Sequence, residues 1–200
     1  MGKQVFAALA GAAFMIGCGG AADAVDSAAA VADESGVPLW TVDADKSRLG
    51  FVASQNGAEF EGAFESFDAE IRFDPDNLEQ STIVVTVDMK SARTGDRQRD
   101  SALPGKDWFL AKEHPTAQFT SSSITKTGDG AYEAAGALTI RDTSKDIVLP
   151  FTLDIEGDQA EANGAVSVVR TDFGVGQGEF SSGKWVGLDV TINVAVSASR

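Results

Sequence analysis

The chain has 200 residues, with 16 basic and 30 acidic side chains and a formal net charge of −14 at pH 7. This balance argues against binding to nucleic acid, because phosphate contacts need clustered lysine and arginine, and against docking on anionic lipid headgroups. A single cysteine, Cys18, excludes an intramolecular disulfide, so stability must come from burial of a core, and the length suits one domain.

Residues 1–17 have the layout of a bacterial export signal: Lys3 supplies a positive charge and Val5–Gly17 supply an apolar run. At about 1.5 Å per residue this run spans about 20 Å as a helix, too short for the ~30 Å hydrocarbon core of a membrane. Cys18 directly after the run resembles the acylated cysteine of a lipoprotein signal. The alternative is ordinary cleavage after residues 22–24 (Ala-Asp-Ala), which would leave a soluble periplasmic protein.

The lipoprotein interpretation places the protein on the periplasmic side of the cell envelope, with acylated Cys18 as its membrane contact. Gly19 follows the cysteine where an aspartate would resemble an inner-membrane retention signal, which favours the outer membrane. The rest of the segment 18–38 consists mainly of alanine, glycine and serine, with four acids and no basic residue. We interpret it as a flexible, self-repelling linker.

From Leu39 onward the dominant hydrophobic period is two, which is typical of strands with one buried face. The longest alternation runs from Val186 to Val196. At about 3.3 Å per residue its eleven residues span about 36 Å, so this strand must coil or bend. The other predicted strands are Trp40–Asp43, Arg48–Ser54, Phe67–Phe73, Ile83–Met89, Ala117–Thr127, Tyr132–Ile140, Ile147–Ile155 and Ala160–Arg170.

About eight strands joined mostly by short turns imply antiparallel hairpins, and the lack of a long amphipathic helix to cover a sheet favours a closed barrel over a sandwich. An eight-stranded barrel is either filled by its own side chains or holds one small ligand. The inward-facing residues are mostly compact valine, isoleucine and leucine, so we expect an apolar tunnel. A filled barrel serving as a structural or interaction module is the alternative.

One connection is too long for a hairpin: about 27 residues separate Met89 from Ala117, and such loops are usually functional or carry their own structure. Gln98–Leu103 and Lys106–Lys112 are each predicted to form a turn or two of helix, separated by Pro104 and Gly105. The apolar side chains in this connection are expected to point at the end of the barrel.

Short motifs along the domain, in this order and spacing, resemble the YceI family. They are Trp40-Thr41-Val42-Asp43 with Ser47 and Phe51, Arg99-Asp100-x-x-Leu103, Trp108-Phe109, Pro115, Phe119-x-Ser121, Gly136–Ile140, Arg170–Gly174 and Gly176-Gln177-Gly178-Glu179. The resemblance covers residues 39–200 and implies an all-β fold, an antiparallel eight-stranded lipocalin-like barrel with a short helical insertion. It also implies an exported protein that carries or stores a long-chain isoprenoid-type lipid, a polyisoprenoid or isoprenoid quinone, without a cofactor. A homodimer is left open.

Three residues depart from the usual pattern of that family: Ala102 stands where many relatives have histidine, Asp142 where glycine is common, and Phe180 where tryptophan is common. If that histidine helps to hold a polar headgroup in relatives, this chain must do without it. Without it, a neutral lipid or quinone is a better expected ligand than one bearing pyrophosphate.

Enzyme chemistry has few candidates in this sequence. His114 is the sole histidine, no Gly-x-Ser-x-Gly elbow is present, and zinc or haem ligation of the usual kinds lacks ligands. We therefore expect no catalytic site and no metal site. A hydrolase or isomerase acting on a lipid would need paired carboxylates, and no pair stands out among the thirty acids.

The candidate binding residues lie in two connections and one strand. Leu103, Trp108, Phe109 and Phe119 are expected to form a lid or wall, and Phe173 and Trp185 to lie near the opposite connection. For each of them, core packing is the alternative. Arg99 and Arg170, with their acidic neighbours Asp100 and Asp172, are expected either to form structural pairs that fix the loops or to contact a headgroup.

Overall fold

The structure is a computed structural model that describes residues 36–200. The predicted signal of residues 1–17, Cys18 and most of the predicted linker lie outside the described residues. Within 36–200, no helix has the length and apolar character needed to cross a membrane.

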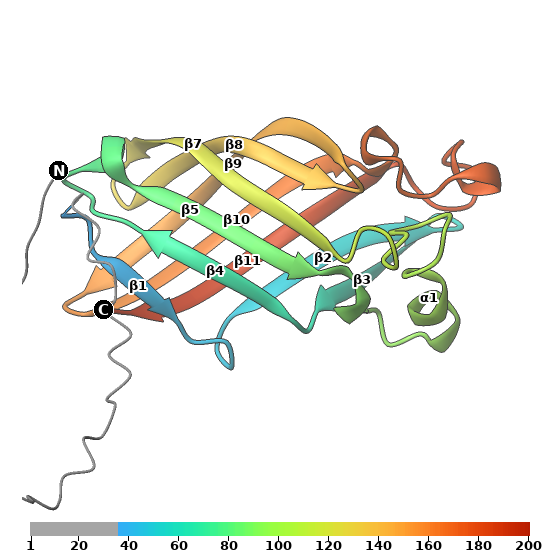
Figure 1. Cartoon of the computed structure of the whole chain (residues 1–200), viewed down its shortest axis with the longest axis horizontal. Coiled ribbons are helices and arrows are strands. Elements are labelled where there is room, and N and C mark those ends of the chain that lie inside the picture. The colour runs from blue at the N-terminus through green and yellow to red at the C-terminus, as the bar shows by residue number, and fades with distance from the viewer. Residues whose placement is uncertain (1–35) are drawn as a thin grey trace, which may run out of the picture. The chain divides into compact units, whose positions relative to one another are not determined.

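The described chain folds as a closed antiparallel barrel (Figure 1), in which pairing of the first strand with the last closes the sheet. The strands are β1 (Leu39–Val42), β2 (Arg48–Gln55), β3 (Ala58–Phe64), β4 (Phe67–Arg72), β5 (Thr82–Asp88), β6 (Ala92–Arg93), β7 (Thr116–Gly128), β8 (Ala131–Ile140), β9 (Thr143–Glu156), β10 (Gln159–Val169) and β11 (Asp189–Ser199). The helical elements are η1 (Leu78–Gln80), η2 (Met89–Ser91), α1 (Arg97–Ala102), η3 (Arg170–Phe173) and η4 (Gly178–Phe180).

The eleven strand segments make up eight long strands, because three of the long strands are each interrupted and divided into two segments. β1 continues as β2, β3 as β4, and β5 as β6, and both parts of each long strand pair with the same neighbouring long strand. A side chain bridges the first interruption: Ser47 Oγ accepts a hydrogen bond from Ser197 N at 3.0 Å. Each long strand therefore pairs with the next in the chain, and the eight-stranded barrel predicted from the sequence is confirmed.

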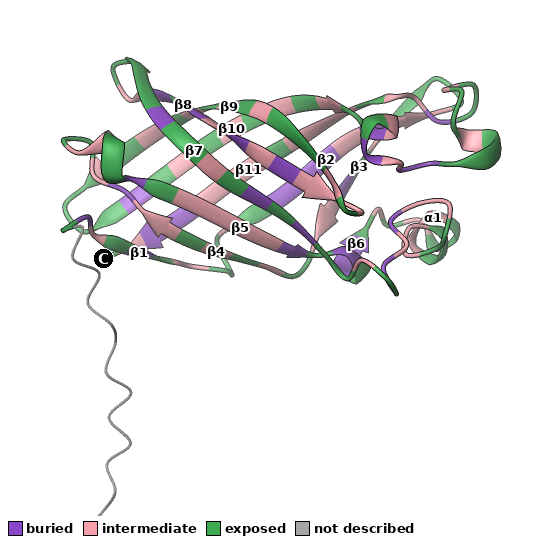
Figure 2. Cartoon of the chain, turned by 45° about the horizontal axis from the view of Figure 1, so that its top comes forward, coloured by how far each residue is buried: buried purple, intermediate pink, exposed green. Residues whose placement is uncertain are grey.

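The hydrophobic period also holds along the strands. Figure 2 shows exposed residues alternating with buried and half-buried ones, and in β9 the alternation is regular from Asp146 to Glu156. The predicted helix at Gln98–Leu103 is present as α1, whose first turn is capped by Asp96.

Three details of the prediction are wrong. Residues 106–112 form turns and no helix, because the chain there folds back on itself through hydrogen bonds to Gly105 O and Pro104 O. The last strand begins at Asp189 and not at Val186, which makes only an isolated bridge to Gln55. β3 was not predicted at all.

The barrel has two different ends. One end, which we call the lid end, carries the two long connections, residues 94–115 (the first lid loop) and residues 170–188 (the second lid loop), together with the turns after β2 and β8. It lies at the right of Figure 1. The other end, the base end, carries residues 36–38, η1, the turns after β7 and β9, and the C-terminus.

Aromatic side chains pack the base end. Trp40 Nε1 donates a hydrogen bond to Phe73 O at 2.9 Å, and both residues are 3% exposed. The Phe73 ring meets Tyr132 edge-on with a centroid distance of 5.4 Å, and Tyr132 stacks on Phe151 at 5.5 Å. Packed aromatic rings therefore border the interior of the barrel on this side.

Candidate functional site

A cavity of about 440 Å³ lies inside the barrel, within the size range of about 300–1,000 Å³ usual for ligand pockets. It reaches from Trp40 and Phe73 at the base end to Trp108 and Phe180 at the lid end. The apolar residues that the barrel strands contribute to its wall include Leu49, Phe51, Phe60, Phe64, Phe67, Ile71, Ile83, Val85, Val87, Phe119, Leu138, Ile147, Leu149, Phe151, Leu153, Ile155, Val166, Val168, Val190, Ile192, Val194 and Val196.

The wall is richer in aromatic side chains than the sequence suggested. All ten phenylalanines of residues 36–200 line the cavity, so the expectation of a mostly aliphatic interior with few large side chains is wrong. Space remains because glycines lie beside the rings: a Cβ atom at Gly136 would lie 2.9 Å from Phe119 Cε2. On β10, Ala162 and Gly164 leave further room opposite the aromatic strands.

Polar side chains of the cavity wall gather at the lid end. Six of the nine polar lining residues are found there, namely Gln55, Thr94, Asp96, Gln98, Arg99 and Arg170. The deeper part of the cavity is bordered almost entirely by hydrocarbon. A ligand with a polar group at one end and a long apolar body therefore fits with the polar group toward the lid.

Arg99 of α1 stands at the rim of the cavity. Its Nη1 donates to Gln55 Oε1 and its Nε to Thr94 Oγ1, both at 3.2 Å, and its guanidinium lies 4.3 Å from the centre of the Phe60 ring. Asp100 instead accepts from Thr94 N and Oγ1 at 2.7 Å. Arg99 is thus a cation fixed at the rim by two neutral acceptors.

Arg170 has a structural role in the second lid loop. Its side chain is buried, and its three guanidinium nitrogens donate to backbone carbonyls. The acceptors are the oxygens of Val175, Gly176, Phe180, Val186 and Gly187, at 2.5–3.2 Å. Burial lowers the pKa of Arg170, but an arginine stays protonated in proteins. With all its nitrogens engaged, Arg170 holds the loop in shape and has no donor left over for a headgroup.

Backbone hydrogen bonds join the two lid loops. Gly176 N and Gln177 N of the second loop donate to Asp107 O of the first, at 2.8 and 2.7 Å. Arg141, in the turn after β8, donates through Nη1 to Gly174 O of the second loop. The loops therefore form one connected layer over this end of the barrel.

Trp108 lies at the centre of that layer. Its carbonyl accepts from Arg141 Nη1 at 2.8 Å, and its ring lies 5.1 Å from the Phe180 ring and 5.5 Å from the Arg170 guanidinium. Trp108 also lines the cavity, so it forms part of the ceiling that the lid presents to a ligand.

The structure brings most of the predicted binding residues together. The cavity wall includes Leu103, Trp108, Phe109, Phe119, Phe173, Arg99 and Arg170. Trp185 does not belong to the wall and is 45% exposed. The reason is the alternation of side chains: Val186 is buried against the cavity, so its neighbour Trp185 points outward.

Three aromatic residues of the cavity wall were not predicted from the sequence. Phe60 and Phe64 line the cavity from β3, and Phe180 lines it from η4. The sequence does contain the alternation expected for a strand at β3, because Phe60, Gly62 and Phe64 alternate with Glu59 and Glu61.

His114 and its carboxylate neighbour lie away from the cavity. His114 Nδ1 lies 3.2 Å from Asp142 Oδ2, and neither residue lines the cavity. Within residues 36–200, no three side chains of His, Cys, Asp or Glu lie together as metal ligands would.

The sequence of this chain matches the model of a known protein family. The model of the YceI-like domain matches residues 40–198. A UPF0312 protein of Pseudomonas syringae pv. tomato is 30% identical over 148 residues, which cover 70% of this chain and 77% of that protein. A UPF0312 protein of Vibrio cholerae serotype O1 is 35% identical over 88 residues, 44% of this chain, and this match spans about half of the relative, 47% of its length.

Solved structures show the same barrel. The crystal structure of Burkholderia cenocepacia BcnA has 34% sequence identity and a TM-score of 0.76, covering 79% of this chain and 99% of that one. A polyisoprenoid binding domain from Saccharophagus degradans has 12% identity and a TM-score of 0.65, covering 80% and 97%. The second likeness is one of fold.

Proposed function

This chain belongs to the YceI-like domain family, and from that premise we propose that it binds one long apolar lipid inside the barrel and carries or stores it unchanged. The observation that carries the proposal is the cavity: hydrocarbon along its length, packed rings at the base end and polar groups toward the lid. Affinity would come from burial of hydrocarbon at about 25 cal/mol per Å², less the cost of ordering a flexible ligand.

The ligand class that fits best is a polyisoprenoid or an isoprenoid quinone. Strands β10 and β11 have eleven residues each, which at about 3.3 Å per residue and a tilt of about 40° gives roughly 28 Å along the barrel axis. A barrel of this length with an apolar lining suits an extended chain. The domain from Saccharophagus degradans, described as polyisoprenoid binding, has the same fold.

The rim favours a small neutral headgroup over a pyrophosphate. Of the two arginines on the lid-end wall, Arg170 is fully engaged by backbone carbonyls, which leaves Arg99 as the cation available to a headgroup. The carboxylate of Asp96 also lines the rim. Ala102, where many relatives have histidine, adds no further donor. A quinone carbonyl or a hydroxyl needs only one or two donors, whereas a pyrophosphate would bring several negative charges against Asp96.

We also propose that acylated Cys18 anchors the protein on the periplasmic side of the cell envelope, in the outer membrane. The sequence of residues 1–19 supports this proposal. A carrier of membrane lipids gains from staying within linker reach of the bilayer. A soluble periplasmic protein is the alternative.

The substitution Ala162→Phe tests the binding function. Ala162 lines the cavity from β10, and a phenyl group there would occupy ligand space. We expect at least tenfold weaker binding of a fluorescent long-chain polyene, with the free energy of unfolding nearly unchanged. Ala165→Phe on the exposed face of the same strand is the matched control and should bind normally.

The two readouts separate a carrier from a filled barrel. In a filled core the same phenyl group would cost about 1–3 kcal/mol of stability, and the parent protein would take up no polyene. That result would refute the carrier function. Recovery of a bound lipid in unchanged form after prolonged incubation tests the non-catalytic part of the proposal.

A further inference from the structure

Four large hydrophobic side chains are exposed among residues 36–200: Leu39 (49%), Val148 (48%), Val169 (37%) and Trp185 (45%). Val148 and Val169 lie on the barrel wall, beyond the point where the ladder between β9 and β10 ends. Leu39 begins β1 at the base end. Trp185 is the one that lies on the lid end.

The backbone around Trp185 is held on both sides while the ring protrudes. Trp185 O accepts from Asn56 N at 2.8 Å, and Val186 O accepts from Arg170 Nη2 at 2.8 Å. The ammonium group of Lys184 lies 4.6 Å from the centre of the Trp185 ring. The structure therefore displays an indole ring and a cation together on a fixed piece of chain.

Trp185 also lies beside the rim of the cavity. Gln55 makes the connection, because its backbone bridges to Val186 and its side chain accepts from Arg99 of α1. Gln98 and Ala102 of α1 are exposed and belong to the cavity wall, so the cavity reaches the surface at this helix.

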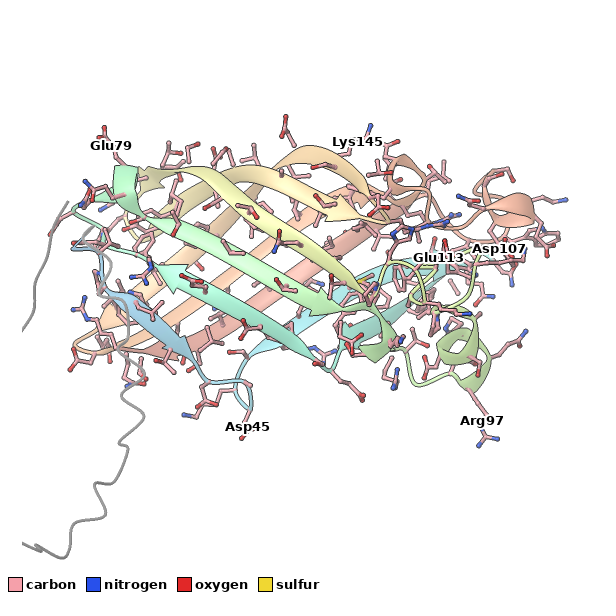
Figure 3. The ribbon with its side chains drawn as sticks, in the orientation of Figure 1. Asp45, Glu79, Arg97, Asp107, Glu113 and Lys145 are labelled. Carbon is pink, nitrogen blue, oxygen red and sulfur yellow. The ribbon has the colours of Figure 1, made fainter. Side chains whose placement is uncertain are left out.

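Charge distinguishes the lid end from the rest of the domain. Its segments, residues 55–57, 94–115, 141–142 and 170–188, hold seven basic and seven acidic residues, so their net charge is zero. Residues 36–200 as a whole hold 15 basic and 26 acidic residues, a net charge of −11. Figure 3 shows Arg97, Asp107 and Glu113 at the lid end and Glu79 at the base end.

All of the excess negative charge therefore lies on the wall and the base end. Those surfaces would be repelled by anionic lipid, and the lid end would not. Tryptophan is enriched at the membrane–water interface, where one part of its ring lies in hydrocarbon and the other contacts water. A neighbouring lysine can lay its hydrocarbon stem along the membrane and keep its ammonium group at the level of the headgroups.

We propose that the lid end docks on the surface of a lipid bilayer through Trp185 and Lys184, and that this contact places the rim of the cavity against the membrane from which the ligand is loaded. The proposal rests on the proposed function, because it gives the route by which the lipid would enter. It names a bilayer as the partner because the indole, the cation and the neutral charge balance occur together next to the cavity rim.

The test uses the full chain carrying Cys18→Ser, so that no acyl chain holds it to vesicles, and phosphatidylcholine vesicles with brominated acyl chains. Bromine quenches tryptophan fluorescence at membrane contact. We expect quenching in the parent, and its loss in Trp185→Ser. Leu39→Ser, which removes an equally exposed apolar side chain at the base end, is the matched control and should be quenched like the parent.

A second readout is the rate at which a fluorescent polyene passes from vesicles to the protein. In Trp185→Ser it should fall at least tenfold, because leaving about half of an aromatic side chain in water corresponds to roughly a 25- to 200-fold loss of membrane affinity. Equilibrium binding of polyene delivered from cyclodextrin should not change. Failure of all variants to bind polyene would count against the proposed function alone, whereas unquenched Trp185 or normal transfer in Trp185→Ser would overturn the docking proposal.

Discussion

The ring of Phe51 covers Gly62 on the neighbouring strand so closely that a Cβ atom at position 62 would lie 2.2 Å from Phe51 Cζ. The two residues are register partners in β2 and β3. Because glycine offers no side chain, the phenyl ring lies against the strand and not across the cavity. A single hydrogen atom at position 62 thus helps keep the barrel hollow.

Gly62→Ala should push the Phe51 ring into the cavity. We expect weaker binding of a long-chain polyene and a loss of about 1–3 kcal/mol in the free energy of unfolding, the usual cost of overpacking. Gly50→Ala is the control, since its added Cβ would meet Gly62 O at an ordinary 3.4 Å. Binding titration and urea unfolding measure the effects. If Phe51→Leu does not restore binding in the Gly62→Ala background, the ring is not the cause.

Arg170→Met should unfold the second lid loop or weaken the whole domain. The substitution leaves five backbone carbonyls without their donor, and hydrogen bonds from a charged group contribute about 1.5–3 kcal/mol each. Since such losses are not additive, we expect the free energy of unfolding, measured with urea, to fall by about 3 kcal/mol or more. Arg97→Met, on the exposed face of α1, should cost little. A small effect at Arg170 would mean that the loop holds its shape without this side chain.

Asp96 makes the N-terminus of α1 sensitive to acid. Its carboxylate accepts from Arg99 N and Gln98 N, and these hydrogen bonds lower its pKa below the ordinary value of 3.8. Because the folded-state pKa is the lower one, the stabilisation is complete above the unfolded-state value and is lost as the pH falls through the folded-state value. Amide chemical shifts of Gln98 and Arg99 should report this step. The step should vanish in Asp96→Asn, and its persistence there would assign it to another group.

Cys18→Ala should release the protein from the membrane and leave lipid binding intact. The acyl group that we propose at Cys18 would be the anchor, and no other part of the proposal gives this residue a role in the cavity. Fractionation of the cell envelope measures the first effect and polyene binding the second. Loss of binding in the variant would show that anchor and cavity are coupled.

The barrel could be predicted from the sequence because its signal is local. Alternation of apolar and polar residues marks each long strand, and β9 shows it over most of its length. β3 was not predicted because its inward-facing residues include Gly62, and a glycine usually indicates a break in a strand. The start of the last strand was misplaced because Val186 also faces inward, although only an isolated bridge to Gln55 pairs it with the sheet.

The lid could not be predicted, because contacts distant in sequence decide it. Arg141 reaches the carbonyls of Trp108 and Gly174, each 33 residues away, and no local pattern encodes such a link. One departure from the family pattern, Asp142, can be explained by the backbone conformation at that position. Asp142 has a φ of 60°, a left-handed conformation that favours glycine, which explains why glycine is common there.

The most direct test of the central claim is native mass spectrometry of the protein purified from its own host without added lipid. We predict one bound lipid per chain, released by organic solvent as a long apolar molecule of the isoprenoid type, and its absence from the Ala162→Phe variant. An empty protein that also takes up no polyprenol or isoprenoid quinone when these are offered would contradict the account.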